Sequence, residues 1–173
     1  MSRPYSAALP ITHGVLRILI VLNWLIGAAI LALLVAMPTR QWIMSALELS
    51  PSAEAERLIM GLRTVAVIGL ATIPLNYAVL KRLLAIVETV RGGEPFVAAN
   101  ASRLRAIAWA LLALQLLSLV IGAIAKALST PARPLDFDAG FSINGWLAVL
   151  LMFVLARVFE EGTLMREDVE GTV

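Results

Sequence analysis

Four long runs of apolar residues alternate with short polar segments along the chain. The runs lie at about 15–37, 62–80, 106–125 and 143–159. Each run is close to the roughly 20 residues that an α-helix needs to cross a hydrocarbon core of about 30 Å. Most charged residues lie between the runs rather than inside them. The pattern therefore predicts an all-α fold, an integral membrane bundle of four transmembrane helices that form a single domain.

The second helix is expected to be longer than the membrane is thick. Ser50 and Pro51 are residues that commonly occupy the N-cap and first positions of a helix, so this helix should begin there and continue to Val90. Pro74 lies inside it and is expected to kink it. The pair Gly92-Gly93 should end it, because glycine readily adopts the left-handed conformation at a helix C-terminus.

The third helix has two possible starts. Pro95 can occupy its first position or Asn100 can cap it, and a short turn from Pro95 that runs into the span is the preferred interpretation. Ser118 and Gly122, four residues apart in this helix, form a small face that lets another helix approach closely. The fourth helix is expected to continue as a helical extension through Met165.

Composition agrees with a membrane protein and excludes several functions. The chain is 60% hydrophobic and only 15% charged, its net charge is +2, and it has no cysteine. Soluble domains are roughly half apolar and about a quarter charged. The absence of cysteine excludes disulfide exchange and thiolate chemistry. The basic balance is explained by residues that flank membrane spans, so no direct nucleic acid binding is expected.

The distribution of basic residues predicts the orientation. If both termini are inside, nine basic residues lie in the inner segments and five in the outer ones. This bias follows the positive-inside rule. It places a hairpin at 81–105 and a tail at 160–173 on the cytoplasmic side.

The hairpin combines basic, acidic, aromatic, glycine and proline residues between two apolar runs. With the tail, it is the candidate cytoplasmic interaction surface. Arg103 and Arg105 have a simpler explanation as anchors to anionic lipid. Arg157 can likewise extend to the interface, or can pair with Glu88 or Glu94. The residues of the candidate surface are Arg91, Glu94, Pro95, Phe96, Asn100, Arg103, Arg105, Arg157, Glu161, Arg166, Glu167 and Asp168.

Three polar residues lie at depth within the expected helices, and they form a candidate intramembrane polar site: Asn23, Asn76 and Gln115. They serve either as helix–helix hydrogen bonds or as the lining of a polar cavity. No Asp or Glu lies inside the spans, which disfavours a proton-coupled transporter. The single histidine, His13, cannot supply a pair of haem ligands or a histidine-rich metal site. Without a nucleophile constellation or a phosphate loop, neither an enzyme nor a cofactor is expected.

Two segments resemble a bacterial family of small four-span membrane proteins, known as domain of unknown function 2975. The segments are GGEPFVAANASRLRAIAWALL at 92–112 and INGWLAVLLMFVLARVFEEGTLMREDVEGTV at 143–173. The pattern of Pro-Phe, then Asn, then a basic pair before an apolar helix is similar to the central motif of that family. The family has no established activity. The resemblance implies a bacterial inner membrane location and, because members are often encoded beside a small helix-turn-helix regulator, such a protein as a partner.

The sequence thus favours a non-enzymatic regulatory or interaction protein that acts through its hairpin and tail. Its expected partners are the lipid bilayer and a cytoplasmic protein such as a helix-turn-helix regulator, and a homo-oligomer is also open. The alternative is a small-molecule transporter or a channel subunit with a polar site near the middle of the membrane.

Overall fold

The computed structural model describes residues 8–36, 53–129 and 139–170, and these ranges are helical apart from short connecting segments. All four helices are long and apolar enough to cross a membrane. The expectation of an all-α protein with four spanning helices is therefore confirmed, and the chain is a multi-pass membrane protein. The helices are α1 (Ala8–Ala36), α3 (Ala53–Arg91), α4 (Ala98–Leu128) and α5 (Ile143–Glu170).

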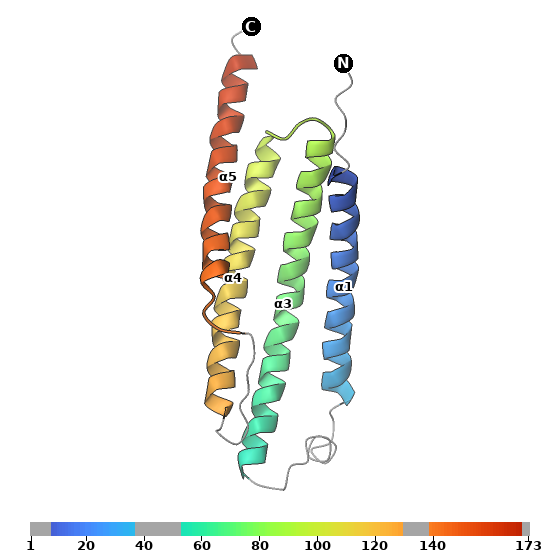
Figure 1. The fold of residues 1–173 in the computed structure, drawn as a ribbon, viewed down its shortest axis with the longest axis vertical. Helices are drawn as coiled ribbons and strands as arrows, with labels where there is room; N and C mark the ends of the chain where they lie inside the picture. The colour runs from blue at the N-terminus through green and yellow to red at the C-terminus, as the bar shows by residue number, and fades with distance from the viewer. Residues whose placement is uncertain (1–7, 37–52, 130–138, 171–173) are drawn as a thin grey trace.

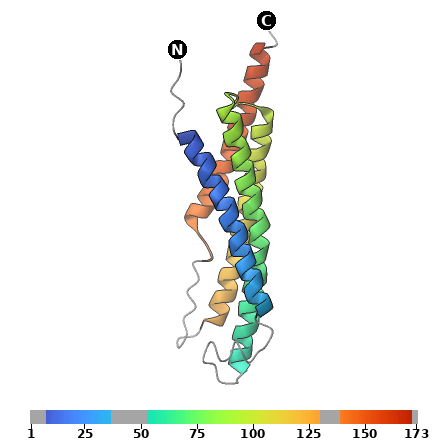
Figure 2. The same cartoon turned by 90° about the vertical axis from the view of Figure 1, so that its right-hand side faces the viewer.

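The four helices lie side by side in one row, in chain order (Figure 1). Among the described residues, each helix contacts only its neighbours in the chain, so α1 contacts neither α4 nor α5. Viewed from the edge, α1 crosses α3 obliquely (Figure 2). The start of α1, the turn between α3 and α4, and the end of α5 lie at the same end of the row, which we call the hairpin end.

The helices bury little apolar surface against one another. In the most apolar stretch of each helix, only 11% to 17% of the residues are buried, and large apolar side chains on all four helices are exposed. Lipid would cover these side chains, so helix association depends on close packing rather than on the exclusion of water. Glycines provide part of this close packing. A Cβ at Gly27 would lie 3.1 Å from Cγ2 of Ile73, and a Cβ at Gly61 would overlap Leu128.

The helix bounds differ from the expected spans mainly by extension. α1 begins at Ala8 rather than near residue 15, and α4 continues beyond 106–125 at both ends. α5 begins at Ile143 as expected and continues past Met165. α3 passes through Pro74 without interruption, while its expected start at Ser50-Pro51 lies outside the described residues.

The end of α3 is a Schellman motif built on the two glycines. Gly93 has φ +85°, in the left-handed region, and its N–H donates to the carbonyl of Val90 at 3.1 Å. The N–H of Glu94 donates to the carbonyl of Thr89 at 3.1 Å. These two bonds satisfy carbonyls that would otherwise lack partners at the helix end. The expectation that Gly92-Gly93 ends this helix is confirmed.

The expected start of the third helix at Pro95 is wrong. Residues 94–97 are not helical, and Val97 occupies the N-cap position with an extended backbone, φ −119° and ψ 144°. Asn100 does not cap the helix either, because it lies inside it. Its side chain binds the carbonyl of Pro95 at 2.9 Å, and residues 94–97 stay non-helical before α4 begins at Ala98.

Candidate functional site

Asn100 is the centre of a hydrogen-bond network that holds the hairpin closed. It is fully buried, with 0% of its surface exposed. Its Nδ2 donates to Thr89 Oγ1 at 2.7 Å and to the Pro95 carbonyl at 2.9 Å, and its Oδ1 accepts from Arg103 Nη1 at 2.8 Å. One amide therefore joins the last turn of α3, the connecting segment and the first turns of α4. A buried amide with all of these groups satisfied fixes a single arrangement of the turn.

Arg103 contributes to the same network. Besides Asn100, its Nη1 also lies 3.4 Å from the carbonyl oxygen of Ala85 in α3. The guanidinium therefore bridges α4 to the backbone of α3. This geometry assigns Arg103 to the internal structure of the hairpin, and its described contacts do not include an acidic side chain.

An aromatic contact fixes the hairpin against α5. The rings of Phe96 and Phe159 have centroids 5.2 Å apart with an angle of 36° between their planes. Gly162 makes room for Phe96, because a Cβ there would lie 3.3 Å from Cδ1 of that ring. Phe96 nevertheless keeps 44% of its surface exposed. It therefore packs on one helix and presents an apolar face to the outside.

A group of charges joins α4 to α5 just beside this contact. Nη2 of Arg105 lies 2.7 Å from Oε2 of Glu160, and Arg157 reaches the same Oε2 at 3.4 Å and Oε1 of Glu161 at 2.8 Å. The alternative pairing of Arg157 with Glu88 or Glu94 is not found among the described residues, where its partners are carboxylates of its own helix. Glu88 instead lies 3.6 Å from His13 of α1.

Glu160 and His13 were not among the predicted surface residues. The spacing of Glu160 from Arg157, three residues apart on one helix, was a signal for a local pair. Its second partner, Arg105, depends on how α4 and α5 are placed relative to one another. The same holds for the contact between His13 and Glu88, because these residues are far apart in the sequence.

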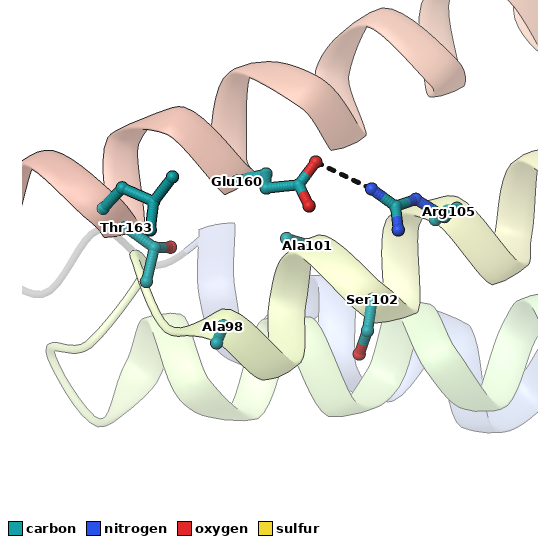
Figure 3. Close-up of a pocket in the computed structure, with 7 residues that line it drawn as sticks. Ala98, Ala101, Ser102, Arg105, Glu160 and Thr163 are labelled. Atoms are coloured by element: carbon teal, nitrogen blue, oxygen red, sulfur yellow. Dashed lines mark hydrogen bonds and ion pairs between the residues drawn. The ribbon is translucent and has the colours of Figure 1, made fainter.

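A shallow open cavity of about 250 Å³ lies between α4 and α5 at this end. In Figure 3 the side chains of Arg105 and Glu160 point toward one another from the two helices, beside Ala101. Small side chains form much of the α4 wall. The lining residues are Ala98, Ala101, Ser102, Arg105, Glu160, Thr163 and Leu164.

The structure thus brings most of the predicted surface residues to one end. Arg91 and Glu94 are exposed at the turn. The side chains of Arg105, Arg157 and Glu161 remain 54%, 68% and 51% exposed despite their ion pairs. The three remaining members of the predicted surface lie near the end of α5, and their side chains are outside the described part of the chain: Arg166, Glu167 and Asp168.

The predicted intramembrane site is not assembled as one site. Asn23 is buried, and its Nδ2 donates to the carbonyl of Ile73 at 3.1 Å, across the α1–α3 contact. Gln115 lies against Gly145, across the α4–α5 contact. No hydrogen bond among the described residues joins Asn76 to either of them. Asn23 therefore serves helix packing, and the two amides occupy different interfaces.

Comparison with known proteins gives a family of unknown function. No curated protein and no solved structure matches the chain. One family model matches residues 33–173, which include α3, α4, α5 and the whole hairpin end apart from the start of α1. The chain therefore belongs to the DUF2975 family, described as proteins of unknown function.

Proposed function

We propose that this protein is a non-enzymatic regulatory membrane protein of the bacterial inner membrane, which binds a cytoplasmic protein partner at its hairpin end. Both termini are placed in the cytoplasm. The excess of basic residues in the segments at this end supports that orientation. A helix-turn-helix transcription regulator is the proposed partner, by analogy with the gene neighbourhoods of the family.

One observation carries this proposal: the turn is held rigidly from within while exposed charged side chains surround it. Asn100 closes the turn and Phe96 packs it onto α5. Around it, Arg91, Glu94 and Arg157 are exposed. A surface that is ordered before binding loses less conformational entropy when a partner binds. Exposed arginines and aromatic residues are also the types most enriched at protein interfaces.

The polar residues at depth give less support to a transporter or a channel subunit. Asn23 is already bonded to a backbone carbonyl, and the amide of Gln115 lies at a separate interface. Transport sites normally gather several polar groups around one pathway. Within the described ranges, these three residues do not lie around one pathway.

Site-specific photo-crosslinking in native membranes tests the proposal. A photoreactive residue at Glu94 should capture a specific cytoplasmic protein, which mass spectrometry then identifies. A matched probe at Lys126, in the last turn of α4 at the opposite end, should capture none. Arg157→Glu should reduce the yield at Glu94 at least fivefold. Equal capture at both positions, or no partner at Glu94, would refute the proposal.

The orientation has an independent test, because the chain has no cysteine of its own. A single cysteine at Glu94 should react with a membrane-impermeant maleimide only after the inner membrane of spheroplasts is permeabilised. Labelling in intact spheroplasts would place the hairpin end outside the cytoplasm.

A further inference from the structure

The segment before α5 lies beside the interior of α4 rather than beyond its end. The N–H of Gly140 donates to Ser118 Oγ at 3.1 Å, and Ser118 Oγ lies 3.4 Å from the carbonyl of Gly140. A Cβ at Gly122 would lie 2.7 Å from Cα of Gly140 and 2.8 Å from the carbonyl oxygen of Ala139. The small face of Ser118 and Gly122, expected to receive a helix, therefore receives this non-helical segment.

This contact places non-helical backbone within the thickness of the membrane. Ser118 lies about 10 Å inside the far end of the predicted span 106–125, at the helical rise of 1.5 Å per residue. Backbone without helical hydrogen bonds is tolerated at such depth only where protein covers it or where water reaches it. Ser118 satisfies Gly140, but Phe141 and Ser142 are exposed. Polar molecules can therefore reach the protein at the start of α5.

Two buried polar atoms at this point have no hydrogen-bond partner among the described residues: Oε1 of Gln115 and Nε1 of Trp146. Gln115 lies against Gly145, where a Cβ would be 2.5 Å from its amide carbon. Trp146 follows directly in the first turn of α5, with its ring 6.4 Å from that of Phe141. One atom is an acceptor and the other is a donor.

Leaving both atoms unpaired would destabilise the fold. A buried polar group without a partner lowers the stability of the fold, and the surrounding hydrocarbon gives no alternative partner. The helix start does not use these atoms. Ser142 Oγ accepts from the backbone N–H of Gly145 at 3.2 Å, and the Ser142 carbonyl accepts from the backbone N–H of Trp146 at 3.1 Å. The two side-chain atoms therefore remain an unused acceptor and an unused donor.

We propose that the start of α5 is a binding site for a hydroxyl group, which accepts a hydrogen bond from Trp146 Nε1 or donates one to Gln115 Oε1. A hydroxyl group can do both, whereas an ion would have to lose its hydration. The hydroxyl belongs either to water that enters along the segment 139–142 or to a lipid headgroup that carries hydroxyls. This site is independent of the hairpin end, and neither proposal depends on the other.

The state of the indole N–H is the direct test. The protein, ¹⁵N-labelled at tryptophan, is placed in nanodiscs of phosphatidylcholine, whose headgroup has no hydroxyl, and of phosphatidylglycerol, whose headgroup has two. The Trp146 signal is identified by its loss in Trp146→Phe. Magnetisation transfer between this N–H and water in both lipids assigns the site to water, and transfer from glycerol protons in phosphatidylglycerol alone assigns it to lipid. No transfer in either lipid overturns the proposal.

The sign of a stability change gives a second test that does not need the signal. Gln115→Leu keeps the size of the side chain but removes its polar atoms. If the acceptor is satisfied by a hydroxyl, this variant should lower the melting temperature by about 2–4 °C, and if it is unpaired, the melting temperature should rise. The control Asn23→Leu should also lower it, because it removes a described bond, but should leave the Trp146 N–H signal in place. A rise for Gln115→Leu overturns the proposal.

Discussion

Replacing Asn100 with alanine should open the hairpin while the membrane spans stay in place. The substitution removes two neutral hydrogen bonds, to Thr89 and Pro95, and one from the charged Arg103. Neutral bonds contribute about 0.5–1.5 kcal/mol each and bonds to charged groups about 1.5–3 kcal/mol. Water partly replaces them once the turn opens. The free energy required to open the hairpin should therefore fall by about 3 kcal/mol.

Limited trypsin digestion measures this opening, since Arg91 is exposed beside the turn. When opening and closing are fast compared with cleavage, the rate of cleavage follows the population of the open form. A change of about 3 kcal/mol then accelerates cleavage after Arg91 about a hundredfold. Mass spectrometry of protein in detergent micelles or nanodiscs follows the cut at this bond.

Two further variants make the reasoning refutable. Thr89→Val removes one bond of the network and should accelerate cleavage about tenfold or less. Ser102→Ala removes only a local bond to the carbonyl of Ala99 on an exposed face and should change the rate little. Because Thr89 and Asn100 share a bond, the double variant should be less severe than the two changes added together. If Asn100→Ala is cleaved as slowly as Ser102→Ala, the network does not hold the turn.

Three other predictions concern single contacts. Gly93→Ala should destabilise the turn by about 1–2 kcal/mol, because Gly93 has φ +85°, and Gly93→Asn should recover part of it in the same trypsin assay. Gly145→Ala should lower the melting temperature, because the new Cβ overlaps the amide of Gln115, and adding Gln115→Ala should restore most of the loss. Arg105→Glu should weaken the α4–α5 contact by less than about 1 kcal/mol, since the pair is partly exposed, and Glu160→Arg in the same chain should restore it at low salt.

The elements with a strong local signal were predictable from the sequence. Four apolar runs fixed the number and type of helices, because length and hydropathy alone decide whether a helix can span a bilayer. Gly92-Gly93 fixed the end of α3 for a similarly local reason, the low energetic cost of a left-handed glycine. The hairpin end also collected the predicted surface residues, since chain direction reverses at each span.

The roles of individual polar residues were not predictable in the same way. Asn100 has the chemistry of a helix cap, but its partner Thr89 is brought to it only by the turn itself. Arg103 has the position of a lipid anchor, yet its guanidinium contacts Asn100 and the backbone of α3. Trp146 was not singled out at all, because its buried N–H becomes significant only once α5 is placed against α4. Each of these roles depends on packing between segments distant in the sequence.

The row of helices divides into a central unit and an added helix. Among the described residues, α1 packs on α3 alone, and the contact is made by Asn23, by Gly27 against Ile73, by the rings of Trp24 and Tyr77, and by His13. The family match begins at residue 33, near the end of α1, and therefore covers α3, α4 and α5. Those three helices and the turn between α3 and α4 contain the Asn100 network, the ion pairs of Arg105 and Arg157, and the buried atoms of Gln115 and Trp146. The structural basis of both proposed sites thus lies within the matched region, and α1 influences them only through its contact with α3.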